Sequence, residues 1–318
     1  MERKFRKKFE SYFFFGLLPV YFISAAFLGF GILAVFLTSV LTGLFADFVF
    51  SKVFKKNRAA KTWLIWALFP LVLPPTIPFW MVIIGIIFTL FFAVFLFGGY
   101  GCNLFHSISI GVIFLLLSYP VMFKNSFLKP PEAPLICTQN SPQKTETNIS
   151  QPSLPELLKG RISENIGDTC PVYLVVFILL FLYWKLIDFR LLTTSLLGTL
   201  LFSGVGNFFL PDQILPPHIQ IFTGTFLLTL ILISADIFCL PRTFEGRWLG
   251  GIILSFFTVL IRSFSNFSEG VFFATLLMNV FTPIFDYQFT RRFYFLRKSK
   301  IKSQSCQQTF EIPNNAAN

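Results

Sequence analysis

Long runs of apolar residues recur along almost the whole chain, and they limit how it can fold more than any other feature. Of the 318 residues, 54% are hydrophobic and only 13% are charged, whereas a soluble domain has about 25% charged residues. In a bilayer the backbone groups must pair within their own segment, so repeated apolar runs of this length predict helices. We therefore predict an all-α integral membrane protein built as a helical bundle.

The apolar runs divide into about ten predicted transmembrane helices. A bilayer core takes about 20 apolar residues per helix. The third run is short and ends at Pro74-Pro75, which indicates a broken or half helix, and the first two are joined tightly around Gly29 and Gly31. The predicted limits are 12–28, 31–50, 63–73, 79–97, 107–123, 170–185, 191–209, 218–235, 246–263 and 268–286.

Basic residues cluster in three places outside these runs. The clusters are Arg3 to Lys8, Lys52 to Lys61 and Arg291 to Lys302. Short basic segments that flank membrane spans are retained in the cytoplasm. With a cytoplasmic N-terminus, ten spans return the C-terminus to the same side, and all three clusters fall there. The net charge of +11 is therefore interpreted as a topology signal, and no nucleic-acid partner is predicted.

One long hydrophilic segment, residues 124–169, interrupts the apolar runs, and we call it the island. It holds five basic and five acidic residues and six prolines. Because no apolar run crosses it, we expect it to lie in water on the side opposite the basic clusters, in a periplasm-like space. The chain then divides into an N-terminal half (1–123), the island (124–169), a C-terminal half (170–290) and a basic cytoplasmic tail (291–318).

A few ionisable residues fall close to the predicted spans. Such residues are costly in a bilayer and are usually functional. The residues are Arg262 and three candidates for an ion pathway, Asp47, Asp236 and Asp286. The alternative is that each lies at a span end, where interfacial water makes its charge cheap. The five cysteines show no paired short spacing, so no metal site is predicted.

Four sequence blocks, in order, resemble one known membrane-protein family. The first reads LPPTIPFWMVIIGIIF, LFGGYGCNLF and LLLSYPV between residues 73 and 121, and the second reads GRISENIGDT at 160–169. The third is PPHIQ followed by TG at 216–224, and the fourth runs from IRSF at 261 to PIFDY at 287. Together they resemble RnfD, a membrane subunit of Rnf-type ion-translocating electron transport complexes. They also resemble its homologue NqrB from the sodium-translocating NADH:quinone reductase.

The resemblance implies a flavin attached to the island. The family carries FMN through a phosphoester on a hydroxyl residue of the motif S-G/Q-A-T-P, and the island reads TQNSP at 138–142. Thr138 takes the place of the family Ser, Ser141 takes that of the flavin-bearing Thr, and Pro142 is retained. The alternative is an unmodified linker Ser beside Pro, which is ordinary turn chemistry. A second, non-covalent flavin or a riboflavin is also implied. The remaining candidate cofactor contacts are Gly98, Gly99, Asn103, Gly224 and Asp236.

The resemblance further implies an electron-relay subunit that is not catalytic alone, in a bacterial inner membrane. Electrons would pass between NADH and ferredoxin, or another acceptor, coupled to Na⁺ or H⁺ movement. The implied partners are the remaining subunits of the complex, together with a flavin transferase and membrane lipid. The short segment before the first span and Pro142 favour the Rnf branch. The alternatives are the NqrB subunit of the quinone reductase and, from another class, a flavin-less scaffold or channel-like subunit.

Overall fold

The computed structural model describes nine stretches of the chain, and these form helices with no strand among them. By length and composition, four helices could cross a membrane, and six shorter apolar helices accompany them. Each of the ten predicted spans coincides with one of these ten apolar helices, which confirms the all-α membrane class. The described residues are 2–54, 62–99, 101, 103–127, 165–169, 171–211, 213–236, 238–265 and 267–310.

The predicted break in the third span is confirmed. Its helix passes into a 3₁₀ turn that ends at Val72, because Pro74 and Pro75 have no N–H groups to continue the ladder. The elements of the N-terminal half are α1 (Glu2–Leu28), α2 (Gly31–Val53), α3 (Trp63–Leu68), η1 (Phe69–Val72), α4 (Phe79–Thr89), the π-helical η2 (Leu90–Phe95), α5 (Ser107–Ser118) and α6 (Pro120–Asn125).

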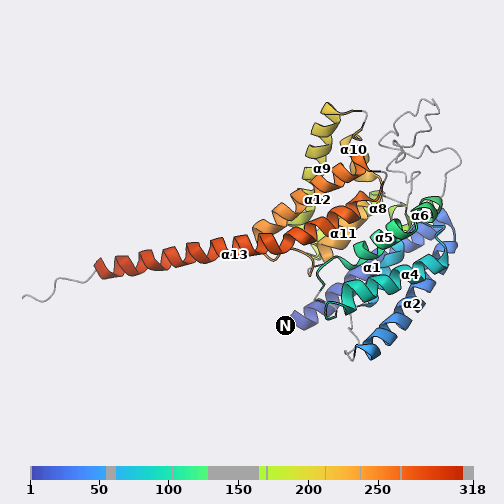
Figure 1. Ribbon diagram of the computed structural model, residues 1–318, viewed down its shortest axis with the longest axis horizontal. Coiled ribbons are helices and arrows are strands. Elements are labelled where there is room, and N and C mark those ends of the chain that lie inside the picture. Colours follow the sequence, from blue (N-terminus) through green and yellow to red (C-terminus); the bar gives the residue numbers. More distant parts are fainter. Residues whose placement is uncertain are drawn as a thin grey trace, which may run out of the picture.

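The predicted eighth span is also interrupted, and its two pieces meet at Gly224, which has a φ of 63°. At the far end of the chain, α13 continues past the predicted boundary at residue 290 and projects well beyond the bundle (Figure 1). The elements of this half are η3 (Ile166–Asp168), α8 (Pro171–Tyr183), α9 (Phe189–Phe209), α10 (Pro217–Phe222), α11 (Phe226–Ala235), α12 (Phe244–Phe264) and α13 (Gly270–Phe310).

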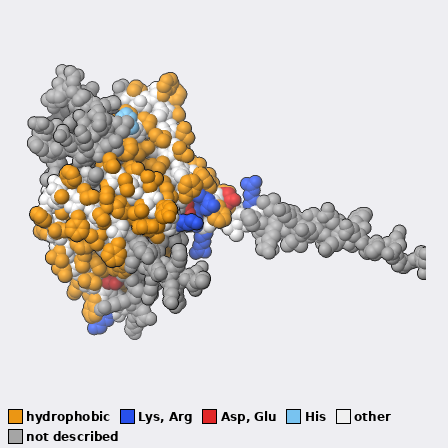
Figure 2. Space-filling model, turned by 180° about the vertical axis from the view of Figure 1, so that it is seen from behind, with side chains coloured by type: hydrophobic (Ala, Val, Ile, Leu, Met, Phe, Trp, Pro, Cys, Tyr) orange, Lys and Arg blue, Asp and Glu red, His pale blue; other side chains and the backbone are white. Residues whose placement is uncertain are grey.

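The two halves repeat one arrangement of helices. In the first half α4 packs against both α2 and α5, and in the second half α12 packs against both α9 and α13. Each half also encloses a short helix whose side chains are almost all buried, α3 with η1 in one and α11 in the other. Hydrophobic side chains cover most of the outer face in Figure 2, as expected of a surface that meets lipid.

The connections between helices gather at two ends of the bundle. At the first end, Thr76 donates from its N–H (3.3 Å) and its Oγ1 (2.6 Å) to the carbonyl of Ser126, where the described part of the chain enters the island. The island returns beside this point, because the Ile166 N–H donates to the carbonyl of Leu73 (3.0 Å). We call this the island end. The other end, where η2 and α11 finish, is called the loop end.

The last residues of the island, 165–169, are buried, so the expectation that the whole island lies in water is wrong for this stretch. Ser24 of α1 donates to the carbonyl of Ile166. A Cβ added to Gly167 would come within 2.8 Å of the carbonyl oxygen of Leu71. Irregular backbone is tolerated at this depth only because protein surrounds it and supplies its hydrogen bonds.

Candidate functional site

A glycine-rich segment follows η2 at the loop end. Gly98, Gly99 and Gly101 have φ angles of 117°, 110° and 100°, a region that side chains with a Cβ rarely adopt. A Cβ on Gly101 would lie 3.2 Å from Cε1 of Phe238. Gly101 therefore packs against the residues that follow α11, and the positive φ angles of the segment need glycine.

The buried amide of Asn279, on α13, ties these two loops together. In the orientation that satisfies both of its groups, its oxygen accepts from the N–H of His106 (2.8 Å) and its nitrogen donates to the carbonyl of Cys239 (3.2 Å). Asn103 in turn donates to Oγ of Ser107 (3.0 Å). The N-terminus of α5 is thereby held against the loop after α11.

Four of the predicted cofactor contacts belong to this loop-end site, and one does not. Gly98, Gly99 and Asn103 lie in the segment that packs against the loop beginning at Asp236. Gly224 lies at the opposite end of α11, and this helix of 10 residues separates them by about 15 Å. Thr138, Ser141 and Pro142 lie outside the described residues.

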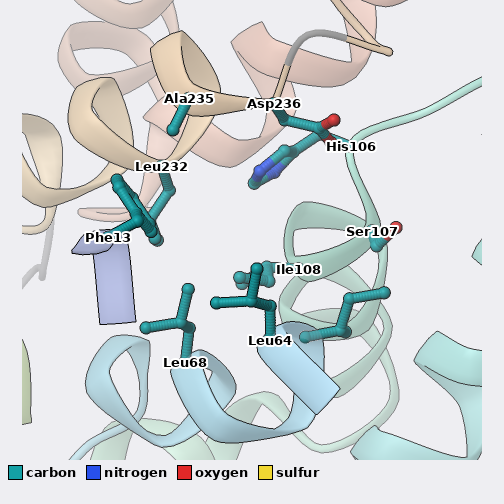
Figure 3. Close-up of a pocket in the computed structure, with 10 residues that line it drawn as sticks. Phe13, Leu64, Leu68, His106, Ser107, Ile108, Leu232, Ala235 and Asp236 are labelled. Carbon is teal, nitrogen blue, oxygen red and sulfur yellow. The ribbon is translucent and has the colours of Figure 1, made fainter. Parts of the chain in front are cut away.

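A cavity of about 60 Å³ opens at the loop-end site (Figure 3). The imidazole of His106 and the carboxylate of Asp236 lie at one side of it, and apolar side chains close the other. Pockets for organic ligands occupy about 300–1,000 Å³, so this space does not fit a flavin. It is large enough for a few water molecules or a small ion. The full lining is Phe13, Leu64, Ile65, Leu68, His106, Ser107, Ile108, Leu232, Ala235 and Asp236.

The site changes the acid–base behaviour of two groups in its connecting loops. Burial lowers the pKa of the His106 imidazole, and the nearby Asp236 carboxylate opposes that shift. Burial also raises the pKa of the Cys239 thiol well above its ordinary range, and the charge and hydrogen bond of Asp236 raise it further. Both shifts favour neutral groups, and Asp236 is the acidic side chain that lines this cavity.

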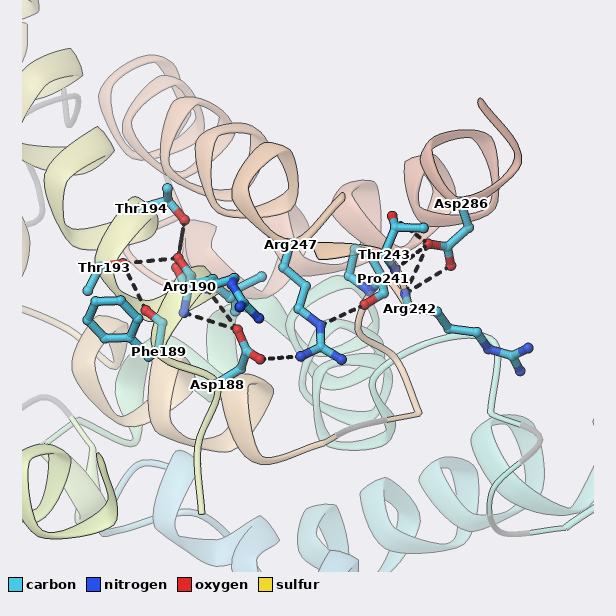
Figure 4. Close-up of polar contacts among 11 residues, drawn as sticks. Asp188, Phe189, Arg190, Thr193, Thr194, Pro241, Arg242, Thr243, Arg247 and Asp286 are labelled. Carbon is cyan, nitrogen blue, oxygen red and sulfur yellow. Dashed lines mark hydrogen bonds and ion pairs between the residues drawn. The ribbon is translucent and has the colours of Figure 1, made fainter. Parts of the chain in front are cut away.

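The other two acidic ion-pathway candidates lie at the same end but contact different neighbours. Asp286 accepts from the backbone N–H groups of Arg242 (2.9 Å) and Thr243 (3.0 Å), and so caps the start of α12 (Figure 4). Asp47 accepts from Oγ1 of Thr62 (2.7 Å). Thr62 directly precedes α3 and Thr243 directly precedes α12, so both carboxylates bind residues at helix starts.

One loop-end ion pair had no counterpart among the sequence-based predictions. Asp188 caps α9 by accepting from the N–H groups of Arg190 (3.1 Å) and Leu191 (3.2 Å), and it also pairs with Arg247 (Figure 4). Arg247 further donates to the carbonyl of Pro241 (3.0 Å). An Asp directly before a helix is a recognisable cap signal, but its partner is 59 residues away and has no local signal.

A second polar centre lies at the island end. The buried carboxylate of Glu269, which precedes α13, accepts from Nδ2 of Asn165 (2.6 Å) and from Oγ1 of Thr225. It therefore joins the end of the island to the break between α10 and α11. The sequence blocks contained both Asn165 and Glu269, but nothing in their spacing of 104 residues predicted the contact.

Replacing Asn279 by leucine should destabilise the loop-end site. Leucine has nearly the same size but leaves the His106 N–H and the Cys239 carbonyl without partners, at a cost of about 1–3 kcal/mol. Thermal unfolding of the purified variant in detergent measures this loss. Thr275→Val on the same helix is the control, because the Thr275 hydroxyl donates to the carbonyl of Val271 within its own helix. An Asn279→Leu variant as stable as Thr275→Val would contradict the expected role of the amide.

Comparison with known proteins assigns the chain to a family. A family model described as the NQR2, RnfD, RnfE family matches residues 4–294. The chain is 28% identical to the D-type subunit of the ion-translocating oxidoreductase complex of Actinobacillus succinogenes, over 87% of this chain and 90% of that protein. It is also 28% identical to the protein of the same name in Escherichia fergusonii, over 86% of this chain and 89% of that protein. This multi-pass membrane protein therefore belongs to the NQR2, RnfD, RnfE family.

Proposed function

We propose that this chain is the RnfD subunit of an Rnf-type ion-translocating electron transport complex in a bacterial inner membrane. The observation that carries the proposal is the family match over nearly the whole chain, together with relatives that are named as one subunit of an ion-translocating oxidoreductase complex. The four blocks that carry the resemblance include Asn103 and Asn279 of the loop-end site. They also include Asn165 and Glu269, which are in contact at the island end. The other subunits of the complex are its proposed partners, and it is not catalytic alone.

The proposed cofactor is FMN, held by the island through a phosphoester. The Ser141 hydroxyl oxygen would bond to the FMN phosphorus of a flavin dinucleotide as the P–O bond of its pyrophosphate breaks. The nucleoside monophosphate would leave and take up the hydroxyl proton, and a flavin transferase would catalyse this step. Bound there, the flavin supplies one-electron transfer, and the protein holds and orients it. Electrons would run between NADH and ferredoxin or another acceptor. We propose no flavin in the cavity beside Asp236, because that space is too small.

The cavity at the loop end supports a different role within the same function. We propose that it admits water and Na⁺ or H⁺ toward Asp236, which is its acidic lining residue. An ionisable residue at the end of a short buried helix is a common element of ion pathways. Asp47 and Asp286 do not line this cavity, so these two residues are weaker choices.

Changing Ser141 to alanine should abolish covalent flavin attachment, because alanine has no oxygen to esterify. Intact-protein mass spectrometry, on protein produced with a working flavin transferase, measures the added mass of one FMN. Ser150→Ala, in the same island, is the control and should keep the flavin. Flavin retained in Ser141→Ala would move the site, with Thr145 and Thr147 as the next residues to map.

The flavin-less scaffold is the second candidate function. Asn140 and Ser141 stand where the Rnf motif has Ala and Thr, and this departure favours it. Wild-type protein without any added flavin mass, from a host whose transferase modifies a control protein, would support the scaffold and exclude covalent attachment.

A further inference from the structure

Arg262 is a charged side chain at the island end whose hydrogen bonds are incomplete. It lies in the last turn of α12. Its Nη1 donates to the backbone carbonyl of Gln220 (2.8 Å), and its guanidinium lies over the ring of Phe226, 5.8 Å from the centroid. Its Nε and Nη2 atoms are buried and have no partner among the described residues. Most of the donors of this side chain are therefore unused.

The charge of Arg262 needs a counter-charge that the described residues do not provide. A guanidinium cannot lose its proton in a protein, and the buried Nε and Nη2 atoms of Arg262 are costly unless they are hydrogen-bonded. Among the described residues, Arg262 has no carboxylate within ion-pair distance. Gly270 packs against Arg262, and the preceding residue, Glu269, already accepts hydrogen bonds from Asn165 and Thr225.

Gln220, whose backbone carbonyl accepts from Arg262, gives a second, independent sign of a missing ligand. Its side chain is only 1% exposed, and neither Nε2 nor Oε1 has a partner in the part of the chain that the structure describes. It belongs to α10, whose backbone already holds Arg262. Buried polar atoms are nearly always satisfied in folded proteins, so two adjacent residues with unused donors indicate an acceptor-rich group between α10 and α12.

We propose that Arg262 and Gln220 form a binding site for a phosphate group. A phosphate offers several acceptor oxygens, and the planar fork of arginine matches them well. Arg262 is only partly buried, and the neighbouring Phe264 is 58% exposed, so a ligand can reach the site from the outer surface. Two sources share this chemistry. One is a phospholipid headgroup, and the other is the phosphoester of a flavin on the island, which rests on the proposed function.

Arg262→Gln should weaken phosphate binding about tenfold or more, because a charge-assisted contact is lost. Delipidated full-length protein is titrated with a short-chain phosphatidylglycerol and with the diacylglycerol of the same chain length, and bound lipid is counted by native mass spectrometry. A wild-type preference for phosphatidylglycerol that disappears in Arg262→Gln identifies the lipid source. Where wild type shows no preference, a fall in the fluorescence anisotropy of the bound flavin in Arg262→Gln identifies the flavin source.

Two further variants keep the test decisive. Arg242→Gln is the control at the loop end, where Arg242 contacts Asp286 through its backbone N–H, and it should match wild type in both measurements. Gln220→Leu removes no side-chain hydrogen bond among the described residues, so it should fold even if Arg262→Gln does not, and it should weaken the same binding. If Arg262→Gln and Gln220→Leu both match wild type in lipid binding and in flavin anisotropy, the proposed phosphate site is wrong. If the wild-type chain carries no flavin, the lipid titration alone tests the phosphate site. Failure of the proposed flavin function and failure of the phosphate site therefore give different results.

Discussion

Glu269→Ala is expected to cause one of the largest losses of stability that a single substitution can cause in this protein. Alanine removes the acceptor of both Asn165 and Thr225, and these groups are buried. Hydrogen bonds to a charged group contribute about 1.5–3 kcal/mol each, so the combined loss should be about 3–6 kcal/mol. The end of the island would lose its tie to the α10–α11 break. Thermal unfolding in detergent, with the yield of monodisperse protein, measures the effect.

A matched control separates this tie from a general effect of removing an acid. Glu245 is exposed in the first turn of α12, and Glu245→Ala should change stability by less than about 0.5 kcal/mol, as surface substitutions usually do. Glu269→Gln should fall between the two, because the amide keeps one acceptor but presents a donor to the other partner. Equal stability of the Glu269→Ala and Glu245→Ala variants would show that the buried contact is not needed.

Gly251→Ala is expected to separate two of the main helices of the second half. The added Cβ would lie 2.7 Å from Cβ of Thr194 and 2.9 Å from the backbone carbonyl oxygen of Leu191, both on α9. A backbone atom cannot rotate away, so α9 and α12 must move apart, and such overpacking typically costs about 1–3 kcal/mol. Chemical or thermal unfolding of the purified variant should show a clear loss of stability.

The neighbouring glycine provides the control. A Cβ on Gly250 would meet Leu191, Met278 and Pro241 at 3.5 Å, which is ordinary contact. Both substitutions improve helix propensity by about 1 kcal/mol, so Gly250→Ala should be neutral or stabilising. If Gly251→Ala proved as stable as Gly250→Ala, the close α9–α12 contact would be wrong.

The sequence predicted the parts of this fold that have a local signal. Ten apolar runs located ten apolar helices, and Pro74-Pro75 located the end of the buried third helix. The glycine segment and Asp236, which the resemblance named together as candidate contacts, lie at one end of the bundle. Apolar length and proline chemistry are properties of one segment, so they can be recognised without knowing what the segment contacts.

Long-range contacts had no such signal. Residues 165–169 are polar enough to have been assigned to water, but they are buried, and Leu73, Ser24 and Glu269 each form a hydrogen bond with them. Hydropathy counts residues and cannot detect partners that are 100 residues away. The same limit explains why Gly224 was grouped with Asp236, although the length of α11 separates them.

The two short buried helices impose an order on the biogenesis of this protein. An independent transmembrane helix needs about 20 residues and a surface that lipid can wet, but α11 has 10 residues, of which 226–234 are buried. The segment formed by α3 and η1 is equally short and enclosed. Neither segment can span the bilayer as an independent helix. We infer that the long helices insert first. These two segments then enter afterwards, each into the space between long helices that have already packed together.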